Sequence, residues 1–159
     1  VVWPIVPEVL LVLTVLAVPR HWLRWTATAL VAGVMGGVAT LALAASGVTL
    51  PQPLVTQPMR QFAATAVAAD GATAVYRQPW SGVPYKGFAA SAGEAQVSAG
   101  SFAVHSAVAR GGRFVLVAGV TALVAVSLRR WRRFYPAAVC VLVAGFSGAL
   151  WSVVTAWSP

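Results

Sequence analysis

The feature that most constrains the fold is a long stretch without charge. From Thr26 to Met59 the chain carries no charged side chain, and the run from Phe114 to Leu128 and the run from Pro136 to Pro159 are also uncharged. A helix that crosses a bilayer needs about 20 predominantly apolar residues. The chain as a whole is 59% hydrophobic and 9% charged, whereas a soluble domain carries about 25% charged residues. Because lipid offers no partner to free backbone groups, spanning segments must be helical, and the sequence predicts an all-α integral membrane protein.

The basic residues lie mostly at the ends of the apolar runs. The net charge is +8, and four arginines fall within five residues just after Leu128: Arg129, Arg130, Arg132 and Arg133. A second group, Arg20, His21 and Arg24, is interleaved with two tryptophans. Such clusters are typical of topology and headgroup signals rather than of a nucleic-acid surface, and the four arginines indicate the cytoplasmic side.

The chain offers little material for catalysis or metal binding. It has three acids, one cysteine and two histidines, and it contains neither a Gly-x-Ser-x-Gly elbow nor a phosphate-binding loop. Paired-carboxylate and nucleophilic mechanisms therefore lack their residues. We expect no enzyme, no cofactor and no metal site.

Two segments are too short or too broken to span the membrane. The first, Val1 to Pro19, has eleven uncharged residues after Glu8, and the second, Tyr76 to Gly93, is rich in Pro, Gly and small residues. Both contain Trp-x-x-Val-Pro, starting at Trp3 and at Trp80. Paired, Pro-interrupted segments in corresponding halves point to the binding site of a transporter. We expect two re-entrant hairpins with tips at Pro7, Gly82 and Pro84, related as a possible inverted repeat; for the first segment a truncated or tilted helix is the alternative.

Four cations are candidates for a phosphate headgroup site: Arg77, Lys86, Arg110 and Arg113. A cation near the bilayer centre costs roughly 2.5–3.5 kcal/mol on insertion scales, so one found there is usually paired or functional. If Tyr76 to Gly93 dips into the membrane, Arg77 and Lys86 would face a cavity; otherwise they lie in an exposed loop or reach the interface. Glu8, an acid in an apolar run, is a candidate for proton coupling, or else a surface residue near the start of the chain.

The expected architecture is a single membrane domain covering 1–159, with at least three transmembrane helices. Its expected parts are a first hairpin (1–19), a transmembrane helix (26–47), an interfacial helix (60–74), a second hairpin (75–93), an amphipathic helix (94–110) and two transmembrane helices (113–130 and 136–157).

The region from Tyr76 to Phe114 resembles the DedA family of VTT or SNARE-associated-Golgi-type membrane proteins, in its short bacterial branch. The resembling residues are Arg77, the run Ser81 to Ala89 (SGVPYKGFA), Ala92-Gly93, Phe102 and Arg110 to Phe114, and Pro4 to Val9 is similar to the family's first re-entrant motif. The resemblance implies two re-entrant hairpins in a multi-pass protein of the bacterial cytoplasmic membrane. It implies movement of polyprenyl phosphate or phospholipid between leaflets, with Glu8 at the first-hairpin acid and Arg77 and Lys86 at the basic positions. The second acid that is common in the family is replaced here by the Pro19, Arg20, His21 region.

The leading hypothesis is therefore a transporter of a phosphate-headgroup lipid that uses Arg77 and Lys86, with Arg110 and Arg113, and Glu8 as proton-exchanging group. The rival is a membrane scaffold whose basic clusters hold anionic lipid, or which packs against a partner helix or a second copy through Gly33, Gly37, Gly145 and Gly148. A divergent, inactive family member is a third reading.

Overall fold

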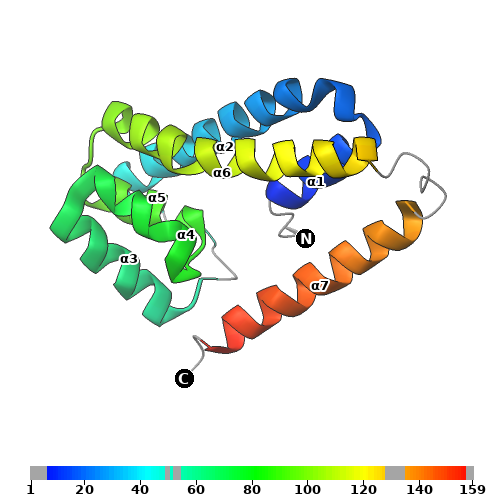
Figure 1. Cartoon of the computed structure of the whole chain (residues 1–159). Helices are drawn as coiled ribbons and strands as arrows, with labels where there is room; N and C mark the ends of the chain where they lie inside the picture. The colour runs from blue at the N-terminus through cyan, green and yellow to red at the C-terminus, as the bar shows by residue number, and fades with distance from the viewer. Residues whose placement is uncertain (1–6, 49–50, 52–54, 128–134, 157–159) are drawn as a thin grey trace. The chain divides into compact units, whose positions relative to one another are not determined.

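A computed structural model describes residues 7–48, 51, 55–127 and 135–156, and the elements assigned within them are all helical (Figure 1). The elements are α1 (Pro7–Ala17), η1 (Pro19–His21), α2 (Trp22–Ala45), α3 (Gln57–Asp70), η2 (Gly71–Arg77), α4 (Gln78–Ser81), α5 (Tyr85–Glu94), α6 (Ala99–Ser127) and α7 (Tyr135–Ala156). The chain divides into two compact units. The first unit is 1–31 with 110–150, and the second is 32–109 with 151–159.

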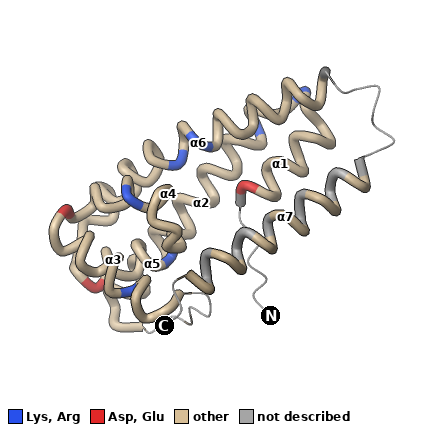
Figure 2. The backbone as a smooth tube through the Cα atoms, turned by 60° about the horizontal axis from the view of Figure 1, so that its bottom comes forward, with Lys and Arg blue, Asp and Glu red and all other residues tan. Residues whose placement is uncertain are grey.

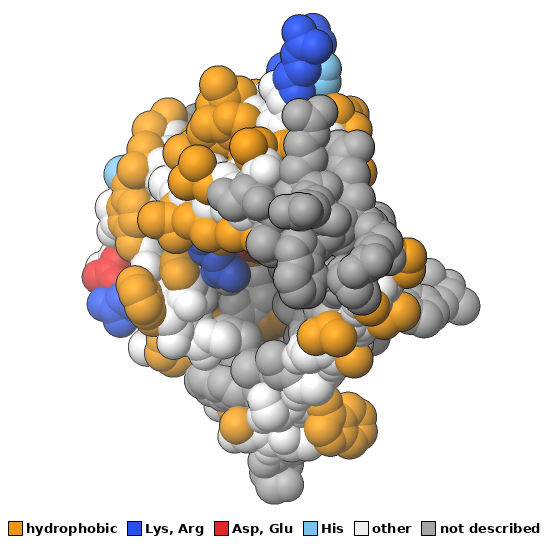
Figure 3. Space-filling model, turned by 45° about the vertical axis from the view of Figure 1, so that its right-hand side comes forward, with side chains coloured by type: hydrophobic (Ala, Val, Ile, Leu, Met, Phe, Trp, Pro, Cys, Tyr) orange, Lys and Arg blue, Asp and Glu red, His pale blue; other side chains and the backbone are white. Residues whose placement is uncertain are grey.

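Two of the helices are long and apolar enough to cross a membrane. They cover Pro19–Ala45 and Ala99–Val126, and only 17% and 22% of their most apolar windows are buried. A core helix of a soluble protein would be mostly buried. Here large apolar side chains such as Met35 on α2 and Leu116 and Leu123 on α6 are exposed, and hydrophobic side chains are spread widely over the face in Figure 3. Exposed apolar surface of this extent indicates a membrane or protein partner, and the two helices indicate a membrane protein.

The core of the first unit lies between α1 and α6. Leu11 and Val15 of α1 are buried with Phe114, Ala118 and Ala122 of α6. The α6 residues are four positions apart and therefore form one stripe. A side chain at Gly119 would lie 3.9 Å from the Trp22 ring, and one at Gly111 would lie 3.6 Å from Leu30. The residue numbers of the contacting positions rise along α2 while they fall along α6, so the two helices are antiparallel in this unit. The start of α2 therefore lies beside the C-terminal part of α6.

The core of the second unit surrounds α5. Residues Gly87 to Gly93 are all buried, and Phe88, Phe102 and Met59 are among the largest fully buried side chains. Tyr85, the first residue of α5, lies against Gly37, while Gly93 lies against Leu41 and Ala44 to Ala45 of α2. The residue numbers of the contacting positions rise along both helices, so α5 runs parallel to the C-terminal half of α2.

Several expected boundaries differ from the observed ones. An amphipathic helix over 94–110 and a separate span over 113–130 were expected, but α6 is one helix from Ala99 to Ser127. The charges and glycines at 110–113 suggested a boundary, whereas Arg113 is ion-paired with Glu8 and Arg110 packs on Phe114. Because both cations have partners, the helix continues through them.

The interfacial helix expected over 60–74 is α3, which ends at Asp70 because Gly71 adopts φ 59°. The chain continues as η2, α4, a turn at Gly82 to Pro84, and α5. α7 is helical where the last span was expected, and its crossing of a membrane stays a prediction. The first copy of the Trp-x-x-Val-Pro motif lies outside the described residues, except Pro7 at the start of α1.

Candidate functional site

An ion pair links the start of α1 to the middle of α6. Pro7 opens α1 and Glu8 follows in its first turn, where a proline is tolerated and an acid suits the helix dipole. Oε1 of Glu8 lies 3.7 Å from a terminal guanidinium nitrogen of Arg113. Figure 2 shows the acid at the start of α1 and basic positions along α6. The pair joins residues more than a hundred positions apart within the first unit.

The pair is loose and only partly satisfied. At 3.7 Å the two atoms are in charge contact but beyond hydrogen-bond distance. Oε2 of Glu8 is buried and has no hydrogen-bond partner among the described residues. The Glu8 side chain is 17% exposed and that of Arg113 is 45% exposed. Arg113 therefore presents part of its guanidinium outward while the carboxylate is held inward.

Arg113 lies at the midpoint of α6. It lies fourteen positions after Ala99 and fourteen positions before Ser127, which corresponds to about 21 Å in each direction. If α6 crosses a bilayer with a hydrocarbon core of about 30 Å, this position lies near its centre. An arginine there requires a counter-charge, water or a ligand.

Arg110 lies close to one turn before Arg113 on the same helix. It is 8% exposed, and its guanidinium carbon lies 5.1 Å from the centre of the Phe114 ring. An arginine over an aromatic face gains a cation–π interaction, which is stronger when the charge is shielded from water. Arg110 is thus a buried, positioned cation, and Arg113 is the more accessible of the two.

In the second unit, Arg77 is paired with Asp70. The two side chains are 2.6 Å apart and are 53% and 32% exposed. The helix break at Gly71 returns the chain so that the two meet. Arg77 also borders an open groove that is lined by Phe62, Tyr76, Trp80 and Ser81. The sequence reasoning missed Asp70 as a partner, although its position at an expected helix interruption was the available signal.

Lys86 is exposed in the first turn of α5. The turn before it is built by Gly82, with φ 69° in the left-handed region, and by Pro84, which precedes the first helical residue. The Val83 N–H donates to the Ser81 hydroxyl, and the Gln78 amide donates to the Val83 carbonyl. The expected tip residues Gly82 and Pro84 therefore lie in an ordered turn between α4 and α5.

The five charged residues predicted for the site fall into two groups. Glu8, Arg110 and Arg113 belong to the first unit, and Arg77 and Lys86 belong to the second. The structure brings Glu8 and Arg113 together and places Arg110 beside them on α6. His105, which had no assigned role, shares a hydrogen bond of 3.1 Å with the Tyr76 hydroxyl. No group of three His, Cys, Asp or Glu side chains that could hold a metal occurs in the described part of the chain.

Comparison with protein-family models, with curated proteins and with solved structures finds no match to this chain.

Proposed function

We propose that this chain is a multi-pass protein of the bacterial cytoplasmic membrane that moves a phosphate-headgroup lipid between leaflets, as its resemblance to the DedA family implies. The observation that supports this most directly is the Glu8–Arg113 pair at the midpoint of an apolar helix. Charged residues inside a membrane are costly and are usually part of a substrate or proton pathway.

The two short helices support the re-entrant part of the proposal. α1 has 11 residues and α5 has 10, about 16 and 15 Å, which is half of a membrane crossing. α1 begins beside Arg113, in the middle of α6. α5 begins beside Gly37, eight residues before the end of α2, and its last turn lies beside Ala44 and Ala45. If α2 and α6 span, each short helix starts within the membrane.

The geometry suggests how the first unit handles an anion. In the absence of lipid, Glu8 neutralises Arg113. A phosphate offers several acceptor oxygens and can bind a guanidinium in a bidentate manner, a stronger arrangement than one contact at 3.7 Å. The headgroup therefore displaces Glu8 from Arg113, and Glu8 is the candidate group for proton exchange during this step. Arg110 adds positive potential from its fixed place against Phe114.

The test is the movement of labelled polyprenyl phosphate, beside labelled phospholipid, across liposomes that contain the purified protein. Arg113→Gln and Lys86→Gln should abolish protein-dependent movement, and Glu8→Gln should uncouple it from a proton gradient. Arg60→Gln, on an exposed position of α3, is the matched control and should behave like the unaltered protein.

The rival scaffold function makes the opposite prediction for this assay. Movement of neither lipid by folded protein would favour it. One of its four glycines is already used within the chain, because Tyr85 covers Gly37, whereas added side chains at Gly145 and Gly148 would meet nothing within 4 Å. Gly145 and Gly148 on α7 are therefore positions at which a partner helix could pack closely.

A further inference from the structure

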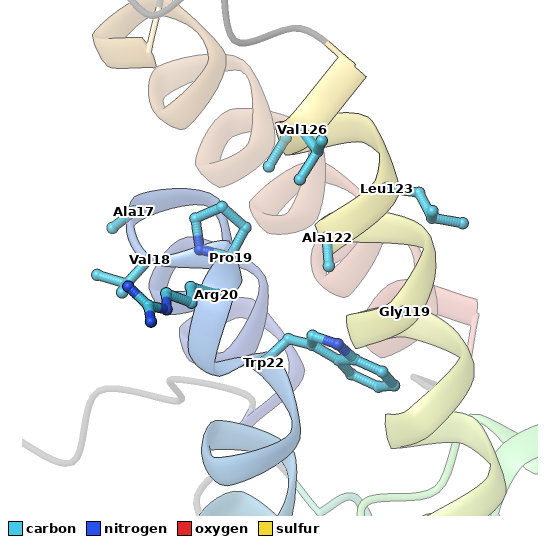
Figure 4. Close-up of a pocket in the computed structure, with 10 residues that line it drawn as sticks. Ala17, Val18, Pro19, Arg20, Trp22, Gly119, Ala122, Leu123 and Val126 are labelled. Atoms are coloured by element: carbon cyan, nitrogen blue, oxygen red, sulfur yellow. The ribbon is translucent and has the colours of Figure 1, made fainter.

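An apolar cavity lies in the first unit, away from the Glu8–Arg113 pair. It has a volume of about 740 Å³ and lies between the bend joining α1 to α2 and the last turns of α6. Figure 4 shows Trp22 extending from α2 toward Gly119, and Val126 on α6 facing Pro19. The residues that line it are Ala17, Val18, Pro19, Arg20, Trp22, Gly119, Ala122, Leu123, Ala125 and Val126.

The sequence explains why a hollow forms here. Pro19 starts a short 3-10 turn, η1, which separates α1 from α2. The facing part of α6 carries the small residues Gly119, Ala122 and Ala125, which leave the space that larger side chains would fill. The volume is within the range of about 300–1,000 Å³ that is typical of sites for small ligands. Its walls suit a hydrocarbon chain.

The charged residues around the cavity favour an anionic lipid headgroup. Among the described residues that line the cavity, Arg20 is the charged one, and it is exposed; Arg24 follows one turn later on α2. No acid occurs among these described lining residues, and Arg129, Arg130, Arg132 and Arg133 follow α6 in the sequence. Because the start of α2 lies beside the end of α6, this is the end expected to face the cytoplasm. Basic pockets between membrane helices on that side bind anionic lipid headgroups.

We propose that this cavity binds the acyl or prenyl chain of an anionic membrane lipid, with its phosphate held by Arg20. The site is distinct from the Glu8–Arg113 pair, and a lipid there would brace α1 and α2 against the end of α6. The inference rests on the membrane placement in the proposed function and is independent of transport.

Trp22 provides a probe, since it lines the cavity. Purified protein in detergent is titrated with brominated phosphatidylglycerol or brominated phosphatidylcholine, and tryptophan quenching is followed. We expect a saturable component with the anionic lipid that Trp22→Phe removes. Arg20→Gln should weaken the apparent affinity for the anionic lipid about fivefold, the contribution of one arginine near a charged surface, and leave the phosphatidylcholine signal unchanged.

Filling the cavity gives a second variant. Ala125→Leu adds volume to the lining, whereas Val120→Leu adds it to a position on α6 outside the lining. The first should reduce the saturable component and the second should not. Saturable quenching that persists in Trp22→Phe, or equal quenching curves for the two leucine variants, would overturn the proposal.

Liposome transport measured on the same protein separates the lipid site from the proposed transport function. Transport without quenching at Trp22 rejects this site alone, and quenching without transport rejects the transporter alone.

Discussion

The proposal that α5 begins within the membrane depends on the close packing of α5 on α2. Gly93 provides the sharpest test of this packing. A Cβ at this position would lie 2.8 Å from the Ala44 Cβ and 3.0 Å from the Ala45 backbone nitrogen, and still closer to the Leu41 carbonyl oxygen. Ordinary contact begins at 3.4 Å, so the methyl group falls short by 3.4 − 2.8 = 0.6 Å even against Ala44. The obstacle is largely the backbone of a helix, which cannot rotate away. In Gly93→Ala, α5 must therefore move off α2.

The size of the effect follows by comparison with Gly36→Ala. An added methyl at Gly36, on the same α2 helix, would meet nothing within 4 Å. Both substitutions gain up to about 1 kcal/mol of helix propensity, whereas overpacking costs about 1–3 kcal/mol at Gly93 alone. The gain in helix propensity is about the same in the two variants and therefore cancels when they are compared. Gly93→Ala should thus be less stable than Gly36→Ala by about 1–3 kcal/mol, which lowers the unfolding midpoint by about 2–12 °C.

The assay is thermal unfolding of the two purified variants in the same detergent, followed by tryptophan fluorescence. Equal midpoints, or a lower midpoint for Gly36→Ala, would show that α5 does not pack on α2 as described. The argument that α5 begins within the membrane would then lose its basis.

Two further predictions concern the second unit. In a Cys140→Ser background, Lys86→Cys should react with a small thiosulfonate but not with a bulky maleimide, because Lys86 is exposed on the protein and a re-entrant tip meets water only through a narrow cavity. Arg60→Cys should react with both reagents, and equal labelling of the two positions from bulk water would contradict the re-entrant geometry. Asp70→Asn should lower the free energy of unfolding by no more than about 1 kcal/mol, because its pair with Arg77 is exposed; a larger loss in a denaturation experiment would mean that the pair is shielded.

The sequence predicted best what depends on neighbouring residues. The uncharged run after Thr26 identified α2, although the helix begins earlier, at Trp22. The group of Arg20, His21 and Arg24, which is interleaved with tryptophans, was interpreted as a topology and headgroup signal, whereas Arg24 lies in the first turn of α2. A turn is present at Gly82 to Pro84, where glycine and proline have strong local preferences; its place at the tip of a re-entrant hairpin stays a prediction.

The sequence could not reveal contacts between distant segments. No local pattern links Glu8 to Arg113, so Arg113 was interpreted as the boundary of a span, whereas it lies at the midpoint of helix α6. A charge ends a membrane helix when it must reach water, but not when an opposite charge on another helix meets it. The same reasoning explains Arg77, whose partner Asp70 becomes a neighbour only after the chain turns at Gly71.

The repeated Val-Pro pair acquires a physical meaning from the two short helices. α1 begins at Pro7 and α5 immediately after Pro84, so each motif opens a half-length helix whose N-terminus carries the positive end of the helix dipole. The charges placed there are opposite. In the first unit Glu8 occupies the positive end of α1 and is balanced by Arg113, whereas in the second unit Lys86 adds to the positive end of α5, with no side-chain cap at Pro84. At the start of α1 a phosphate would therefore compete with Glu8 for Arg113. For the proposed transporter this means that exchange at the Glu8–Arg113 pair sets when the headgroup is released.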